Sequence, residues 1–234
     1  MRNLPVHWYE GLFLRPQHFQ SADRHWAEVQ GKSGAWDDPC NYGIHQVRFS
    51  KEALGNYQFE LQLLQARLRD GTLVDLDSGE EPDRLDLRSA FGKGGEKIDL
   101  REAFEKEGIV TVYVGVPKVV LGRANVTRPG GAEPARYVEA TGTVQDESWG
   151  GEDQEIQFRR LNVRLLLSTQ DLTGYELLPV ARVKRTGASE AVPELDDTFV
   201  PPLLSIDAWP GLGRDVVRGL YDAVSYTHLT LPTK

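Results

Sequence analysis

Residues 57–68 and residues 156–167 alternate apolar and polar side chains, and each stretch shifts its apolar positions by one residue partway along. The apolar positions are Tyr57, Phe59, Leu61 and Leu63, then Leu64, Ala66 and Leu68, in the first stretch, and Ile156 and Phe158, then Leu161, Val163, Leu165 and Leu167, in the second. Alternation with a period of two is typical of a β-strand that buries one face. A shift of one residue inside such a strand predicts a bulge or a passage from one sheet to another.

Further strands are expected between these two stretches and after them. Asp70-Gly71 is a turn signal, so residues 72–76 are expected to return beside the first strand. The remaining expected strands are residues 109–116, which end at Pro117, residues 136–144, and residues 175–184, in which Pro179 indicates a sheet edge or a bulge. Long surface loops are expected at residues 77–107, with a short helix over 99–106, and at 123–134 and 147–155. The spacing favours a mainly β fold, an antiparallel β-sandwich, over an alternating βαβ sheet.

The N-terminal residues 6–20, called the aromatic arm below, are dense in large side chains. Pro16 suits the first turn of a helix, because its missing N–H has no partner there in any case. The apolar stripe Phe19, Ala22, Trp26 and Val29 then predicts a helix that ends at Gly31. An arm with so many aromatic residues must pack on its own domain or on a partner.

The C-terminal region changes character after the strands. Leu212, Val216, Leu220 and Val224 recur every fourth residue and predict a helix, whereas residues 225–234 break the pattern and resemble a translated sequencing adapter. We therefore expect a β-sandwich domain over residues 1–190, a linker over 191–204, the first helix of a truncated helical bundle over 205–224, and an artefact over 225–234. On this interpretation the chain is the N-terminal part of a longer protein.

Composition excludes several classes of function. The chain has 27 Lys and Arg against 35 Asp and Glu, a formal net charge of -8, which argues against general nucleic-acid binding. Its one cysteine, Cys40, rules out an intrachain disulfide and any site built from several cysteines. With neither a visible signal peptide nor an apolar run of about 20 residues, we expect a cytoplasmic protein without direct membrane insertion.

No motif carries a convincing catalytic, cofactor or metal site. Gly31-Lys32-Ser33 is similar to the end of a phosphate-binding loop, but Trp26 occupies the place of its first glycine. The glycines of residues 92–95 lack the dinucleotide-binding spacing, and His18 and His25 lack a carboxylate at ligand spacing. The acidic residues 152–155 beside Trp149 are expected to form a solvated loop. We expect no enzyme activity and no cofactor.

The aromatic arm is the most specific part of the sequence. Residues 8–20 read Trp-Tyr-Glu-Gly-Leu-Phe-Leu-Arg-Pro-Gln-His-Phe-Gln, and further motifs follow at 70–72, 112–117, 178–183 and 199–204. On these motifs, residues 5–223 resemble the TssK family (also called ImpJ/VasE), the baseplate subunits of bacterial type VI secretion systems. The resemblance implies an N-terminal β-sandwich shoulder, similar to that of siphophage receptor-binding proteins, a helical-bundle middle and a C-terminal head.

The resemblance also implies a function and a set of partners. Family members form homotrimers that link the wedge proteins TssF and TssG to the membrane-complex proteins TssL and TssM, at the cytoplasmic side of the inner membrane. The shoulder faces the wedge and the head contacts the membrane complex, so this chain is expected to carry the wedge-facing part only. A structural role, without catalysis, follows from this resemblance.

One surface is expected to make such contacts. We predict that five residues of the aromatic arm lie at an intersubunit or wedge contact, because buried aromatic side chains dominate interface energies. They are Trp8, Leu12, Phe13, Leu14 and Phe19. The alternative is that they close the bottom of their own sandwich. Two other functions stay open: a phage-like receptor-binding or carbohydrate-binding module that uses Trp149, and a hydrolase that uses Glu152 or Asp153.

Overall fold

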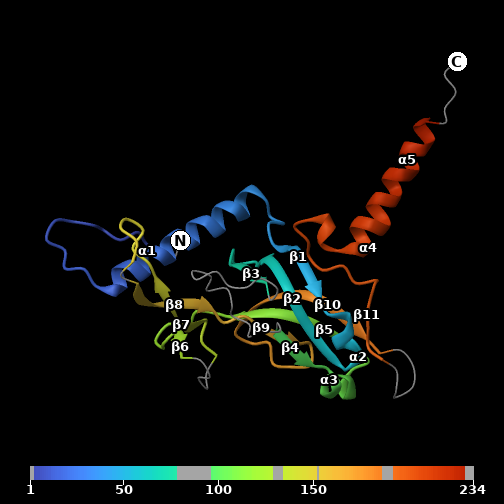
Figure 1. Ribbon diagram of the computed structural model, residues 1–234, viewed down its shortest axis with the longest axis horizontal. Helices are drawn as coiled ribbons and strands as arrows, with labels where there is room; N and C mark the ends of the chain where they lie inside the picture. The colour runs from blue at the N-terminus through green and yellow to red at the C-terminus, as the bar shows by residue number, and fades with distance from the viewer. Residues whose placement is uncertain (1–2, 78–95, 129–133, 152, 186–191, 230–234) are drawn as a thin grey trace.

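Two antiparallel sheets pack face to face in the computed structural model, which describes residues 3–77, 96–128, 134–151, 153–185 and 192–229 (Figure 1). The first sheet has the order β1-β2-β3, with β4 paired to the other half of β2, and the second has the order β11-β10-β5-β9. The strands of the first sheet are β1 (Gly43–Phe49), β2 (Gln58–Arg67), β3 (Leu73–Asp77) and β4 (Glu96–Asp99). Those of the second are β5 (Ile109–Pro117), β9 (Arg164–Leu167), β10 (Tyr175–Lys184) and β11 (Glu194–Leu195). The predicted antiparallel β-sandwich is confirmed.

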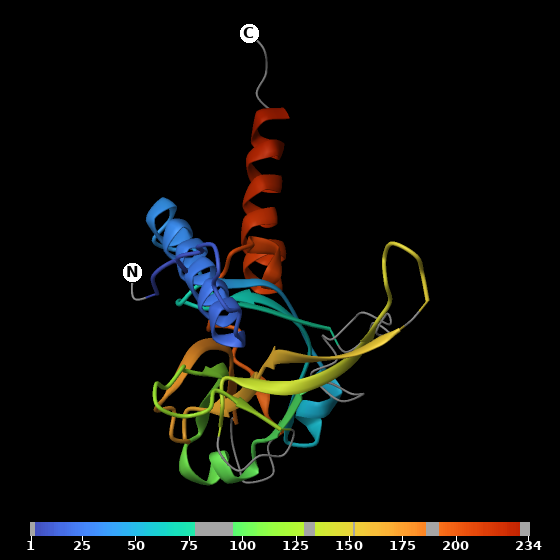
Figure 2. The same ribbon diagram turned by 90° about the vertical axis from the view of Figure 1, so that its left-hand side faces the viewer.

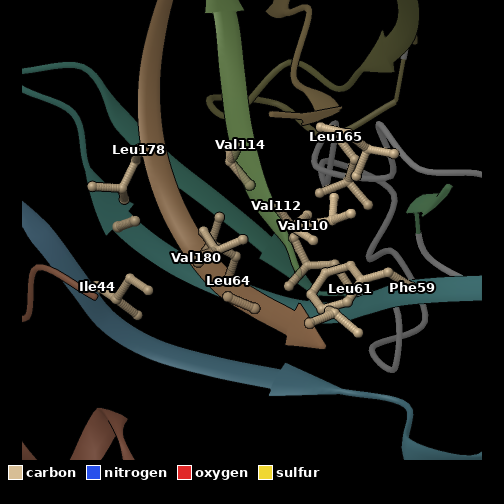
Figure 3. Close-up of a cluster of buried hydrophobic side chains, with 14 of the residues drawn as sticks. Ile44, Phe59, Leu61, Leu64, Val110, Val112, Val114, Leu165, Leu178 and Val180 are labelled. Carbon is tan, nitrogen blue, oxygen red and sulfur yellow. The ribbon is translucent and has the colours of Figure 1, made fainter. Parts of the chain in front are cut away.

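The core lies between the two sheets, as Figure 3 shows. β2 and β3 contribute their alternating leucines, and β5 and β10 contribute valines and Leu178 from the opposite side. The fully buried side chains include Ile44, Phe59, Leu61, Leu64, Val110, Val112, Val114, Leu178 and Val180. Phe59, Leu61 and Leu64 are at alternating positions that the sequence analysis named. Ile44 lies in β1, a strand that the sequence analysis did not predict, and for β5 and β10 it predicted the strands but not their buried faces.

Both shifts in apolar parity have a structural cause. In β2, Leu61 pairs with Phe49 and Leu63 with Arg48, so β2 carries one extra residue at this point and the register shifts. The second expected strand is divided into β8 (Gln154–Leu161), in a third sheet, and β9, in the second sheet of the sandwich. The sequence predicted a bulge or a change of sheet at each shift. The structure confirms this, with a bulge in β2 and a change of sheet between β8 and β9.

Pro179 lies in β10 at a second register shift. Pro179 pairs with Tyr113 of β5 and Ala181 with Val112, which leaves one extra residue in β10 between these pairs. On its other side, β10 pairs with β11 only at Val183 and Lys184. Because proline has no N–H to donate, it is tolerated at this bulge and unpaired edge, as the sequence predicted.

Two of the expected loops contain strands. The range 77–107 holds β4 and the predicted short helix, α3 (Arg101–Lys106), and the range 123–134 holds β6 (Val126–Thr127). β4 was missed because only four residues pair with β2, and a run that short among charged residues shows no clear alternation. The glycine-rich residues 92–95 lie outside the described residues.

A third sheet has the order β6-β7-β8 and extends away from the sandwich (Figure 2). β7 (Tyr137–Val144) and β8 form a hairpin whose ladder runs without a register shift from the Tyr137–Leu161 pair to the Val144–Gln154 pair. β6 adds a short parallel pairing at Tyr137 and Val138. The connecting turn contains Trp149 and is part of the expected loop 147–155.

Helix α1 (Pro16–Asp37) is longer than the sequence predicted. Pro16 is at its first turn, as expected, but the helix passes Gly31 and Gly34 and ends only at Asp37. Gly31 packs against the β2–β3 turn, because a Cβ atom built on Gly71 would lie 2.7 Å from the Gly31 Cα. Gly31 therefore permits a close approach between segments and does not end the helix, so this prediction was wrong.

The C-terminal segment first follows the sandwich and then leaves it. β11 pairs with β10, and an isolated bridge joins Leu203 to Ile44, so the predicted linker is attached to both sheets. Short helical turns follow, and α5 (Gly219–Leu229) continues through Ser225, where the apolar pattern stops. The short turns are η1 (Ile206–Ala208), α4 (Pro210–Leu212) and the π-helical η2 (Gly213–Arg218); α2 (Lys51–Gly55) lies earlier, between β1 and β2. The domain boundaries stay a prediction.

Candidate interaction surface

The residues before the aromatic arm fold back along α1. The backbone N–H of Asn3 donates to the Glu28 carboxylate at 2.8 Å, and the Asn3 amide donates to the same oxygen at 3.0 Å. The ring nitrogen Nδ1 of His25 lies 2.9 Å from the Asn3 carbonyl oxygen. These contacts close a loop of chain between residue 3 and the start of α1, at the far left in Figure 1.

Aromatic rings gather where this loop meets the helix. The ring of Trp8 lies 6.2 Å from that of Phe19 and 6.3 Å from that of His18, measured between centroids. The Nδ1 atom of His18 accepts a hydrogen bond from the Arg15 backbone N–H at 3.0 Å, which fixes the ring at the first turn. Two of the five predicted residues, Trp8 and Phe19, thus lie together where the loop joins the helix, and each is about half exposed, at 51% and 53%.

Phe13 and Leu14, which precede the helix, also point to solvent, whereas Leu12 beside them is half-buried. Phe13 is 78% exposed and Leu14 is 56% exposed. The guanidinium of Arg15 lies 5.9 Å from the centre of the Phe13 ring, a cation–π distance that leaves the other face of the ring uncovered. Two large adjacent apolar side chains are therefore presented outward by a loop that is tied at both ends.

None of the five residues belongs to the buried core of the described residues. Helix α1 has no buried residue, and Trp26 and Trp36 on it are 63% and 82% exposed. Closing the bottom of the sandwich would require at least some of these side chains to be buried against β-strands. The geometry favours the contact hypothesis over that alternative, and the assignment to a partner stays a prediction.

Helix α1 is nevertheless attached to the sandwich at defined points. Its Gly31 contacts the β2–β3 turn, and the Asp23 carboxylate pairs with the Arg159 guanidinium of β8 at 2.8 Å. Arg159 also lies 5.1 Å from the ring of Tyr137 in β7. The helix is thereby held by a backbone contact near its C-terminal end and by an ion pair nearer its N-terminal end.

A buried carboxylate holds the segment that leads to α5. Asp196 accepts hydrogen bonds from Thr198, through the hydroxyl at 2.7 Å and the backbone N–H at 3.1 Å, and from the Arg182 Nε at 2.6 Å. The Thr198 hydroxyl bond, supported by the other two donors, lowers the pKa of Asp196 by stabilising its charged form, and burial opposes this only in part. Residues 196–198 are thus anchored on β10 by a charged group.

The other candidate sites of the sequence stay apart. Within the described ranges no three His, Cys, Asp or Glu side chains lie close enough together to hold a metal ion. Cys40 is exposed, and Trp149 is 90% exposed at the end of the β7–β8 hairpin. Asp153 lies in the same turn, whereas Glu152 is outside the described residues. Among the helices that the structure describes, none is both long and apolar enough to cross a membrane.

Sequence reasoning missed one exposed and one buried feature of the fold. Trp36 was not expected on the helix, because the helix was predicted to end before it. Arg136 was treated only as the start of a strand, yet its guanidinium is buried and contacts Asp70, Thr72 and the Pro117 carbonyl. No local pattern identifies such a residue, since its partners lie 19 to 66 positions away in the sequence.

Known proteins share both the sequence and the fold. The sequence profile of the family described as "Bacterial Type VI secretion, VC_A0110, EvfL, ImpJ, VasE" matches residues 18–226. The type VI secretion system baseplate component TssK1 of Pseudomonas aeruginosa is 30% identical over 221 residues, which are 90% of this chain and 44% of that relative. This chain therefore spans about half the length of the curated relative that it matches.

Solved structures extend the similarity to three dimensions. A TssK-TssF-TssG baseplate subcomplex contains a chain with 24% identity and a TM-score of 0.75, and the match covers 96% of this chain and 70% of that one. A crystal structure of TssK matches with 23% identity and a TM-score of 0.79, over 99% of this chain and 52% of that one. The resemblance inferred from the motifs is confirmed: the chain belongs to the bacterial type VI secretion family that includes ImpJ and VasE.

Proposed function

We propose that the chain is the wedge-facing part of a structural baseplate component of a bacterial type VI secretion system. The observation that carries the proposal is the exposed aromatic arm, which lies outside the core of its own sandwich. The name of the relative, a baseplate component, and the name of the TssK-TssF-TssG subcomplex support the same role. TssF and TssG are the partners proposed for this part of the protein.

The wider role rests on the family resemblance. The whole protein is proposed to act as a homotrimeric adaptor between the wedge and the membrane-complex proteins TssL and TssM, at the cytoplasmic side of the inner membrane. The membrane-complex contact is assigned to the C-terminal head, which this chain does not span. The proposed role is assembly and not catalysis, in keeping with the name of the relative, a baseplate component.

The contact is assigned to Trp8, Leu12, Phe13, Leu14 and Phe19. Trp8 and Phe19 support each other at the start of α1, and Phe13 and Leu14 supply the outward-facing apolar area. Exposed apolar side chains of this size gain free energy when a partner removes them from water, at about 25 cal/mol per Å² of buried apolar surface. The loop is already closed by the Asn3–Glu28 contacts, so binding orders little new chain.

Alanine at both Phe13 and Leu14 tests this assignment. We expect co-purification with the TssF–TssG wedge to weaken by at least about tenfold, because two interface anchors are truncated. The melting temperature should change by less than about 1 °C, since neither side chain is buried.

A matched control uses Val119 and Leu121, which are 43% and 89% exposed in the segment after β5. Their double alanine variant removes similar apolar area and should retain wedge binding. A Phe13/Leu14 variant that binds the wedge normally, or that loses most of its thermal stability, contradicts the assignment.

A further inference from the structure

The turn of the β7–β8 hairpin presents a single tryptophan at the end of a projecting element. Trp149 is 90% exposed, and the turn lies far from the sandwich, as the yellow loop at the right of Figure 2 shows. Every described residue from Gln145 to Asp153 is exposed. A large aromatic side chain held so far from its own core has no role in the stability of the sandwich.

The turn is held in one shape by its own hydrogen bonds. The Asp146 carboxylate accepts from the backbone N–H groups of Ser148, at 2.7 Å, and Trp149, at 3.2 Å. The Asp146 carbonyl oxygen accepts from the Gly150 N–H at 3.0 Å. Gly150 and Gly151 have φ angles of 68° and 89°, which glycine adopts without strain. Trp149 is therefore presented by an ordered backbone, which lowers the entropy cost of binding through it.

The charges around Trp149 all have the same sign. Every charged residue in the range 143–155 is acidic, and those in described positions are Asp146, Glu147, Asp153 and Glu155. Such a surface repels nucleic acid and anionic membrane headgroups. It attracts a surface that carries Lys and Arg.

The shape of the turn separates protein partners from small ligands. Sites for sugars and other small molecules are concave, and they enclose most of the ligand. Trp149 stands on a convex end with no described side chain forming a wall beside it, so it inserts into a pocket more readily than it forms one. Aromatic anchors of this type bind pockets on protein partners.

We infer that the β7–β8 turn is a second protein-docking element, in which Trp149 enters an apolar pocket with a basic rim on a baseplate partner. This contact is separate from the aromatic arm. The inference rests on the proposed function in one respect: the partner is the TssF–TssG wedge. The acidic side chains orient the approach and Trp149 supplies the anchor.

The test measures binding of the purified full chain to the TssF–TssG wedge of the same bacterium, by biolayer interferometry. Trp149→Ala should weaken the affinity by about 30-fold, the size expected for an interface anchor, and Trp149→Phe should weaken it less. Leu121→Ala is the control, because Leu121 is a large apolar side chain, 89% exposed, in the segment after β5, and it should change the affinity by less than about twofold. The triple variant Glu147→Gln, Asp153→Asn, Glu155→Gln should slow association and reduce its dependence on salt.

Each other outcome overturns the inference. Wild-type affinity in Trp149→Ala shows that the turn is not an anchor, even though the arm can still bind the wedge. Failure of the wild-type chain to bind the wedge overturns the proposed function together with this inference. Glycan-array binding that depends on Trp149, or a Trp149-dependent oligomer in sedimentation analysis, replaces the wedge with a sugar or with a second copy of the chain.

Discussion

At the scale of single residues, two buried charged groups join segments that are distant in the sequence. Arg136 donates to Asp70 Oδ2 at 3.0 Å, to Thr72 Oγ1 at 2.6 Å and to the Pro117 carbonyl at 3.1 Å. It thereby connects the start of the β7–β8 hairpin to both sheets of the sandwich. Asp196 anchors the segment that precedes α5 on β10 through Arg182, and it also accepts from the nearby Thr198. Both groups are surrounded by donors or acceptors, so the loss of either leaves partners unpaired.

Replacing Arg136 by alanine should lower the free energy of unfolding by about 3 kcal/mol, because it leaves the Asp70 carboxylate and the Pro117 carbonyl without their partner. Urea denaturation measures this. Arg159→Ala is the matched control: its ion pair with Asp23 is between side chains that are 35% and 62% exposed, and its loss should cost less than about 1 kcal/mol. Equal losses in the two variants would show that Arg136 has no special structural role.

Asp196 makes stability depend on pH in a defined direction. The lowered pKa of the folded-state carboxyl means that its stabilising effect is complete above the unfolded-state pKa, about 3.9. The effect is lost as the pH falls through the lower folded-state pKa. Asp196→Asn should therefore be less stable than the wild type at pH 7, and the difference should shrink below about pH 4.

Urea denaturation at a series of pH values measures the Asp196 effect. Asp197→Asn serves as the control, because Asp197 is the adjacent, exposed residue. A stability difference for Asp196→Asn that stays constant from pH 7 to pH 2 contradicts the assigned role of the carboxylate.

At the scale of elements, the strands with clear alternation were predictable, whereas β1, the short strands β4, β6 and β11, and the contacts between elements were not. The alternation in residues 57–68 identified β2 together with its bulge, because a strand with one buried face must alternate. From the sequence, α1 was expected to end at Gly31, because a glycine often ends a helix. In the structure Gly31 instead contacts Gly71, which lies 40 residues later in the sequence. The exposed arm residues were identified from their type alone. Their position outside the core required the structure.

The Gly31–Gly71 contact can be tested with a matched pair of glycines. Gly71 has a φ of 86° and an added Cβ would lie 2.7 Å from the Gly31 Cα, whereas Gly122 has a φ of 85° with open space around it. Alanine at Gly122 should cost about 1 kcal/mol of unfolding free energy, from the left-handed backbone alone. Alanine at Gly71 should cost clearly more and should increase hydrogen exchange in the second half of α1. Equal effects at the two glycines would contradict the contact.

At the scale of the whole molecule, much apolar surface lies on helices outside the sandwich. Trp26 and Trp36 on α1, and Leu220, Tyr221 and Val224 on α5, are all more than half exposed. Figure 2 shows α5 standing clear of the sheets. The chain matches less than half of its curated relative, so the prediction that α5 begins a helical bundle concerns residues that this chain does not span. Faces of this kind are typical of a component that is completed by assembly.

The contact between Gly31 and Gly71 is also a pivot point near the C-terminal end of α1. From Gly31 to Pro16 the helix rises about 22 Å, at about 1.5 Å per residue. If the helix turned by about 10° about that contact, with the Asp23–Arg159 pair released, the start of the helix would move by about 4 Å. A small change in the β2–β3 turn would thus change the direction in which Phe13 and Leu14 point without altering either side chain. Related proteins with a different turn would then present the same two side chains to partners of a different shape.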